Sequence, residues 1–142
     1  MPIMYISYIY IIEGEPMKII ISNSSNLPIY EQISTQIKSM IMQGELKEGD
    51  ALPSMRTLAK DLRISLITTK RSYEDLERDG FIKSFTGKGS FVAPSNMDLL
   101  REESLKKIEA YLTNAIETAK TSGISNSELT KIFNIILEDT YE

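Results

Sequence analysis

Residues 52–76 read LPSMRTLAKDLRISLITTKRSYEDL and predict two short helices with a tight connection between them. Ser54 stands where the first helix begins and Ser65 where the second begins. Serine is a favoured N-cap because its side-chain oxygen accepts a hydrogen bond from a backbone N–H that the helix leaves free. Apolar residues recur at helical spacing after each serine, and the second helix carries Lys70 and Arg71. The pattern predicts a helix-turn-helix, whose second helix typically enters the major groove of DNA.

A hairpin is expected directly after these helices. The second helix should run to Asp79, with Gly80 as the residue that ends it. Residues 81–85 and 90–93 are strand-like, and the TGKG sequence at 86–89 between them is a hairpin turn signal. A helix-turn-helix followed by a basic, glycine-containing hairpin is a winged helix. The expected fold class is therefore mainly α with a small β-wing.

An earlier helix is predicted between Pro28 and Gly44. Proline suits the start of a helix because its φ is fixed and it has no N–H to leave unpaired, and glycine commonly ends one. The apolar residues that recur at helical spacing are Ile29, Ile33, Ile37, Met40 and Ile41. A short strand-like run over residues 19–22 precedes this helix.

The last third of the chain predicts an antiparallel two-helix tail. One long helix should end near Gly123, and Ser125 with Glu128 forms a capping box for a final helix. Two helices alone cannot bury so many apolar residues, so they must pack on the winged helix, on a second copy, or on both. The expected dimerisation residues are Leu105, Ile108, Leu112, Ile116, Leu129, Ile132, Phe133 and Ile136.

Residues 1–16 differ from the rest of the chain. The run over residues 3–12 is nearly all Ile, Tyr and Met, yet it is too short to cross a bilayer and lacks the basic start and cleavage site of a signal peptide. The residues EGE at 13–15 require purine-rich codons shortly before Met17, where a bacterial ribosome-binding site would lie. We therefore expect the natural start at Met17, with an extra strand or helix as the structural alternative. The expected domains are 1–16 leader, 17–95 winged helix and 96–142 dimerisation tail.

Composition excludes most catalytic chemistry. The 142 residues contain no Cys and no His, which removes disulfides, thiolate metal sites and the usual general base. We expect no enzyme, no catalytic residue, no cofactor and no metal site. The net charge of −4 is uneven, because residues 54–95 carry eight Lys/Arg against five Asp/Glu and residues 96–142 carry five against nine. A basic middle and an acidic tail suggest two separate tasks, although chance variation of solvated faces would look the same. The lack of Cys fits a cytoplasmic protein.

An ordered series of motifs runs through residues 28–92. It comprises Pro28-Ile29-Tyr30-x-Gln32-Ile33, Gly44-x-Leu46-x-x-Gly49-x-x-Leu52-Pro53-Ser54-x-Arg56-x-Leu58-Ala59, Leu62-x-Ile64-Ser65-x-x-Thr68, Tyr73-x-x-Leu76-x-x-x-Gly80 and Gly87-x-Gly89-x-Phe91-Val92. The stretch resembles the GntR family of bacterial transcription regulators. Only 47 residues follow Ser95, and a short two-helix tail resembles the YtrA-like subfamily. The resemblance implies a homodimeric DNA-binding repressor, often of a transporter operon, with an inverted-repeat operator.

The resemblance also implies which residues meet DNA. Arg56 and Lys70 match family positions that reach DNA, whereas Arg71 is an open case. The hydroxyls near the two helix starts suit phosphate contact or simple capping, and the wing tip suits phosphate or minor-groove contact. The expected DNA-binding residues are Ser54, Arg56, Ser65, Leu66, Ile67, Thr68, Lys70, Arg71, Thr86, Gly87 and Lys88.

Leu66 and Ile67 depart from the family pattern, which often has Arg at the first of these positions. Either one of them turns into the core, or both meet the methyl groups of thymine in the major groove.

Other functions remain open at this point. A winged helix kept as a protein-interaction module is the alternative from another class, and the exposed pair Leu66 and Ile67 would suit it. A membrane anchor in residues 3–12 is disfavoured because the run has no charged face. A cleft between the tail helices could hold a small apolar effector.

Overall fold

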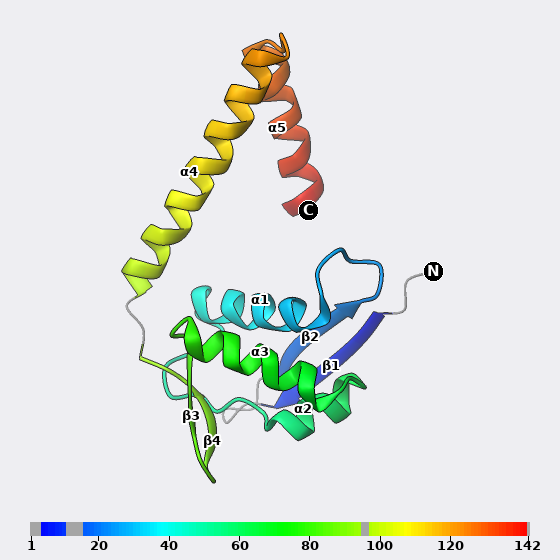
Figure 1. Cartoon of the computed structure of the whole chain (residues 1–142), viewed down its shortest axis with the longest axis vertical. Helices are drawn as coiled ribbons and strands as arrows, with labels where there is room; N and C mark the ends of the chain where they lie inside the picture. Colours follow the sequence, from blue (N-terminus) through cyan, green and yellow to red (C-terminus); the bar gives the residue numbers. More distant parts are fainter. Residues whose placement is uncertain (1–3, 11–15, 95–96, 142) are drawn as a thin grey trace. The chain divides into compact units, whose positions relative to one another are not determined.

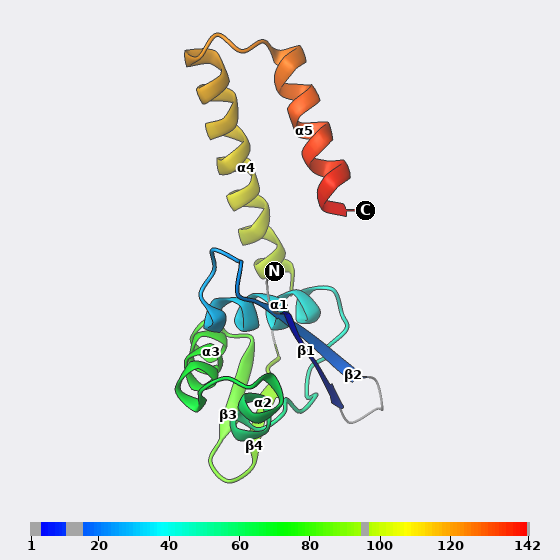
Figure 2. The same cartoon turned by 90° about the vertical axis from the view of Figure 1, so that its right-hand side faces the viewer.

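The computed structural model describes residues 4–10, 16–94 and 97–141 (Figures 1 and 2). The chain divides into two compact units, Met1–Met97 and Asp98–Glu142. The elements in chain order are β1 (Met4–Tyr10), β2 (Pro16–Ser22), α1 (Ile29–Met42), α2 (Met55–Leu62), α3 (Leu66–Arg78), β3 (Ile82–Phe85), β4 (Gly89–Val92), α4 (Met97–Thr121) and α5 (Asn126–Tyr141). The expected fold class, mainly α with a small wing and two C-terminal helices, is confirmed. No helix in the described ranges is long and apolar enough to cross a membrane.

Three helices build the core of the first unit. Helix α3 packs against both α1 and α2, and α1 also packs against β2 (Figure 1). The predicted repeat of α1 is confirmed at three isoleucines, while Ile29 and Met40 are only half-buried. The largest fully buried side chains are Ile19, Ile21, Ile33, Ile37, Leu58, Leu62, Tyr73, Leu76 and Ile82.

The wing is a short antiparallel hairpin. Strands β3 and β4 pair from Ile82 with Val92 to Phe85 with Gly89. Ala51 forms an isolated antiparallel bridge to Phe91. This bridge fastens the base of the wing to the segment that leads into α2.

A second hairpin precedes α1. Strands β1 and β2 pair antiparallel from Met4 with Ser22 to Tyr10 with Pro16. The alternative of an extra strand near the N-terminus therefore matches the structure, and β2 is longer than the predicted strand because it has this partner. The residues EGE at 13–15 lie outside the described ranges, and the start at Met17 stays a prediction.

Two glutamines of α1 bind the other edge of β2. The Gln36 amide accepts from the N–H of Ile20 at 2.9 Å and donates to its carbonyl at 2.7 Å. The Gln32 amide does the same at Ser22, with distances of 2.9 and 3.0 Å. A side-chain amide carries both a donor and an acceptor, so each glutamine pairs with the strand as a neighbouring backbone would. The edge of β2 that faces α1 is thereby closed.

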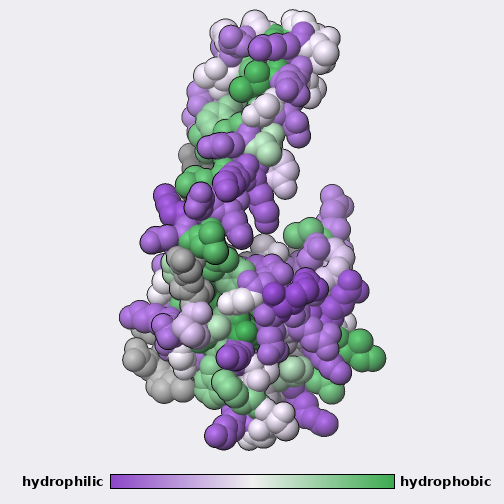
Figure 3. Space-filling view, turned by 60° about the vertical axis from the view of Figure 1, so that its left-hand side comes forward, coloured by the Kyte–Doolittle hydropathy of each residue, from purple (hydrophilic) through white to green (hydrophobic). Residues whose placement is uncertain are grey.

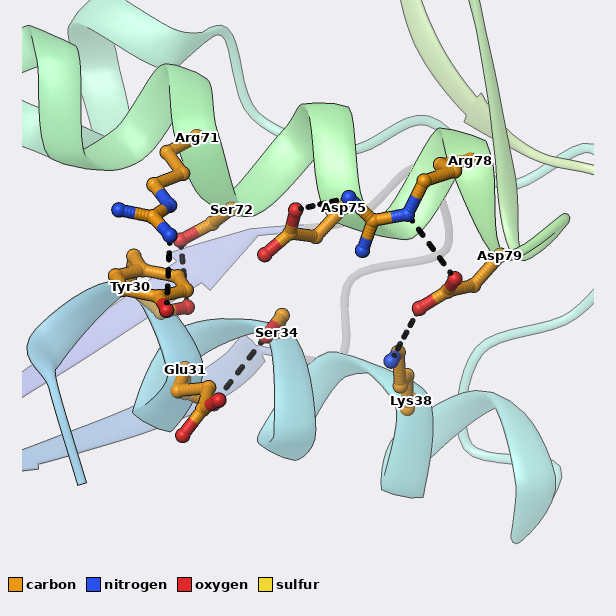
Figure 4. A network of polar contacts seen from close by, with 9 residues as sticks. All are labelled: Tyr30, Glu31, Ser34, Lys38, Arg71, Ser72, Asp75, Arg78 and Asp79. Atoms are coloured by element: carbon orange, nitrogen blue, oxygen red, sulfur yellow. Dashed lines mark hydrogen bonds and ion pairs between the residues drawn. The ribbon is translucent and has the colours of Figure 1, made fainter.

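Ion pairs join the C-terminal half of α1 to the end of α3 (Figure 4). Lys38 Nζ lies 2.7 Å from Asp79 Oδ2, and Arg78 bridges Asp75 at 2.9 Å and Asp79 at 3.5 Å. The hydrogen bond from Lys38 lowers the pKa of the Asp79 carboxyl, against a smaller opposing effect of burial. The charged carboxylate is therefore stabilised in the folded state.

Tyr73 ties α3 to the start of α2. Its ring is buried, and its hydroxyl donates a hydrogen bond of 2.7 Å to the carbonyl oxygen of Pro53. Burial raises the pKa of the Tyr73 hydroxyl, so it remains a donor throughout the neutral range.

Replacing Tyr73 by Phe should lower the free energy of unfolding by about 1–2 kcal/mol, because the partly buried Pro53 carbonyl loses its hydrogen-bond partner. Urea unfolding followed by circular dichroism measures the change. Tyr111→Phe is the matched control, because its ring is 71% exposed on α4, and it should leave the free energy of unfolding unaltered. Equal effects of the two substitutions would contradict the role given to Tyr73.

Asp79→Asn should reduce stability at neutral pH by less than about 1 kcal/mol, since the pair is partly solvated. The folded pKa lies below the ordinary value of 3.8, so the stabilisation is present above that value and is lost as pH falls through the folded pKa. The unfolding curves of the variant and the parent should therefore converge in acid. Asp61→Asn, at an exposed position of α2 with no ion pair in the described part of the chain, is the control.

Candidate nucleic-acid interface

The turn between α2 and α3 is built from two serine caps and one left-handed residue. Ser54 Oγ accepts from the Thr57 N–H at 3.1 Å, and Ser65 Oγ accepts from the Thr68 N–H at 3.1 Å. Both predicted caps are confirmed. Arg63 ends α2 with φ 56°, which is uncommon for a residue that has a Cβ. This backbone lets the Ile64 N–H donate to the Ala59 carbonyl at 3.0 Å and turns the chain toward α3.

The cap hydroxyls are already engaged within the turn. Ser54 Oγ donates to Thr57 Oγ1 at 2.8 Å, and the hydroxyls of Ser65 and Thr68 share a hydrogen bond of 2.7 Å. Their capping role is thus established in the structure, and contact with phosphate stays a prediction. Of the expected DNA-binding residues, all are exposed except Thr68, which is half-buried.

Helix α3 has a buried face and an open face. Thr69, Ser72, Tyr73 and Leu76 are buried. Leu66 is 41% exposed and Ile67 is 81% exposed, so the alternative in which one of them turns into the core is wrong. The inner face of α3 is formed by the buried set, to which neither side chain belongs.

Lys70 and Arg71 are neighbours on α3 with different surroundings. Lys70 Nζ lies 3.9 Å from Glu74 Oε1, and both side chains are well exposed. The Arg71 guanidinium lies 3.8 Å from the centre of the Tyr30 ring and donates to the Tyr30 hydroxyl at 3.1 Å (Figure 4). The Ser72 hydroxyl donates to the Tyr30 carbonyl at 2.8 Å in the same place. Arg71 therefore has a structural contact with α1, which the sequence pattern did not indicate.

Other expected residues lie on α2 and on the wing. Arg56 is exposed in the first turn of α2, with no hydrogen-bond or ion-pair partner among the described residues. Gly87 has φ 78°, a conformation that glycine adopts without strain, and the neighbouring Lys88 is exposed. Phe85, at the base of the turn, is 48% exposed beside Phe91, with ring centres 6.2 Å apart. Phe85 was not among the expected DNA-binding residues, and its observed contact is packing against Phe91 within the wing.

The tail unit carries a large apolar surface. Helices α4 and α5 run antiparallel (Figure 2), and apolar side chains lie among polar ones on the face of the tail that Figure 3 shows. Ala119 is the sole buried residue among those described there. An apolar groove of about 460 Å³ lies between the helices, as the sequence suggested. All but Leu105 and Ile108 of the predicted dimerisation residues line this groove. The lining residues are Leu112, Ala115, Ile116, Leu129, Thr130, Ile132, Phe133 and Ile136. The predicted capping box is present in part, because Ser125 Oγ accepts from the Glu128 N–H at 3.2 Å.

Known proteins share both the sequence and the fold. The family described as bacterial regulatory proteins, gntR family, matches residues 29–92. The HTH-type transcriptional repressor YtrA of Bacillus subtilis is 35% identical over 114 residues, which is 80% of this chain and 85% of that protein. A transcriptional antiterminator from Listeria monocytogenes superimposes with a TM-score of 0.63 at 31% identity, covering 84% of this chain and 89% of that one. YtrA from Sulfolobus acidocaldarius, a GntR-family transcription factor, gives a TM-score of 0.50 at 34% identity, covering 61% and 92%.

Alanine substitutions of Lys70 and Arg71 should have different effects on stability and on DNA affinity. Arg71→Ala removes the stacking on Tyr30 and should lower the free energy of unfolding by about 0.5–1 kcal/mol. Lys70→Ala should leave stability nearly unchanged but reduce the slope of log affinity for DNA against log salt by about one. Urea unfolding and binding titrations at several salt concentrations measure the two quantities. A larger stability loss for Lys70→Ala than for Arg71→Ala would refute this division.

Proposed function

The chain belongs to the GntR family of bacterial regulatory proteins and is a DNA-binding regulator of transcription. We propose that it acts as a homodimeric repressor on an inverted-repeat operator. The expectation that it is not an enzyme agrees with the family, whose named members here regulate transcription. Its match to the repressor YtrA over 85% of that protein's length supports the YtrA-like assignment and the repressor role.

The open face of α3 is the observation that carries the proposal. In this reading Leu66, Ile67 and Lys70 reach base edges or phosphates in the major groove, because the N-terminal residues of a recognition helix lie deepest there. Arg56 in the first turn of α2 is available for DNA because no protein group engages it in the described ranges. The hydroxyls of Ser54, Ser65 and Thr68 lie at helix starts, where contacts with phosphates would fix the position of the protein along the duplex. Arg71 supports α3 through its contact with Tyr30 of α1. The remaining contacts come from the wing, at Thr86, Gly87 and Lys88.

A second copy is proposed to cover the tail. The side chains that line the groove leave apolar surface exposed between the two helices, and exposed apolar patches commonly mark sites of protein–protein contact. Leu105 and Ile108 are likewise exposed and extend the apolar face of α4. Residues 96–142 would then be the dimerisation tail and residues 17–95 the DNA-binding domain. A dimer presents two recognition helices, which predicts half-sites about one helical turn, or a multiple of it, apart.

The tail also bears on two further possibilities. Its groove is lined almost entirely by apolar side chains, so any effector held there would be a small apolar molecule. Its excess of acidic residues disfavours contact with DNA, which is consistent with a position away from the duplex.

Fluorescence anisotropy on the DNA upstream of the gene, with scrambled DNA of equal length as control, tests the proposal. We expect preference for the native site, a steep salt slope and two subunits per duplex. Equal affinity for both duplexes at every salt concentration would contradict the proposal that an operator lies upstream of the gene. No binding to either duplex would favour a protein-interaction module.

Ile116→Glu places a charge in the tail groove and should convert the dimer into a monomer. Affinity for the full operator should fall by about a hundredfold or more, because the second half-site is no longer linked to the first. Sedimentation and anisotropy measure the two effects, and circular dichroism verifies that the helices persist. Asn114→Glu, two residues earlier and on the opposite face of α4, is the control and should change neither quantity. A dimer that survives Ile116→Glu would contradict the proposed interface.

A further inference from the structure

The outward side of the first turn of α3 is apolar. Ile67 is the most exposed large hydrophobic residue in the described part of the chain, at 81%, and Leu66 precedes it. The cap at Ser65 and the buried face around Tyr73 hold the helix in place, and neither Leu66 nor Ile67 belongs to the buried core. A β-branched residue in an exposed helical turn is also no aid to helix formation. The pair therefore calls for a partner outside the chain.

The polar side chains around this pair have partners within α3 and its N-cap. The hydroxyls of Ser65 and Thr68 bind each other, and Lys70 lies near Glu74 one turn further along. Beside Leu66 and Ile67, the first turn of α3 therefore carries only the two short cap hydroxyls, which are held against the start of the helix. The side chains of Leu66 and Ile67 have neither a donor nor an acceptor, so they can contact a base only through its apolar groups.

We infer that Leu66 and Ile67 read the 5-methyl groups of thymine, so that each half-site places A·T pairs against the first turn of α3. The inference rests on the proposed function, because it requires α3 to lie in the major groove. Thymine carries the one apolar group that an unmodified base presents in that groove. Arg63 and Lys70 flank the pair with positive charge, which favours a polyanion as the partner over an apolar protein surface.

The first step of the test selects binding sequences from a randomised duplex library with the full-length chain. We expect an inverted repeat with invariant A·T pairs at one or two positions of each half-site. If no sequence is enriched, the operator proposal itself fails and the inference falls with it. An enriched sequence with only G·C pairs under α3 would leave the operator intact and overturn the inference alone.

The second step replaces each thymine of the selected duplex by deoxyuridine, which removes only the methyl group. At the contacted thymine, affinity should fall about fourfold, because the complex no longer buries one methyl group of the base. This loss should disappear in Ile67→Ala or Leu66→Ala, while the salt slope stays as in the parent because no charge changes. Leu27→Ala, which truncates a comparably exposed leucine before α1, is the matched control and should keep the full sensitivity.

Two results would overturn the inference. One is a duplex in which no deoxyuridine replacement lowers affinity. The other is a methyl effect that persists unchanged in both alanine variants. Because Leu66 and Ile67 are exposed, both variants should fold, and their thermal unfolding is recorded beside the binding data.

Discussion

The packing of one face of α3 is the constraint on which the rest of the DNA-binding unit depends. Tyr73 and Leu76 are buried on α3, which packs against both α1 and α2, and the Tyr73 hydroxyl donates a hydrogen bond to the Pro53 carbonyl just before α2. Once this face is buried, the rotation of the helix about its own axis is fixed, because successive residues are separated by a constant angle. Leu66, Ile67 and Lys70 must then point outward. The buried face of α3 therefore determines which of its side chains are available to contact DNA.

Much of this arrangement could be predicted from local sequence. A serine that caps a helix and a glycine that ends one act within a few residues, so Ser54, Ser65 and Gly80 identified the bounds of α2 and α3. The wing was predictable for the same reason, because its turn requires glycine at Gly87. The two alternatives for Leu66 and Ile67 could be separated only when the buried face of α3 was known.

Other features could not be predicted, because they depend on contacts between distant segments. The stacking of Arg71 on Tyr30 joins residues of two helices, and nothing in either local sequence marks it. Gln32 and Gln36 look like ordinary polar residues of α1, yet they close an edge of β2. Arg63 offered no sign of its left-handed backbone, since glycine or asparagine is the usual signal. A single sequence carries little information on such pairings.

The loose pair between Lys70 and Glu74 has a consequence for how the proposed complex would form. At 3.9 Å, and with both side chains in solvent, the pair is easily broken. The Glu74 carboxylate partly neutralises Lys70 in the free protein, so a DNA phosphate that binds Lys70 replaces this ion pair. The favourable binding free energy of the Lys70–phosphate contact is then smaller than that of a lysine without an ion pair, whatever the DNA sequence. Such an exchange weakens attachment to arbitrary DNA by the same amount as attachment to the operator, and so leaves discrimination to the groups that touch the bases.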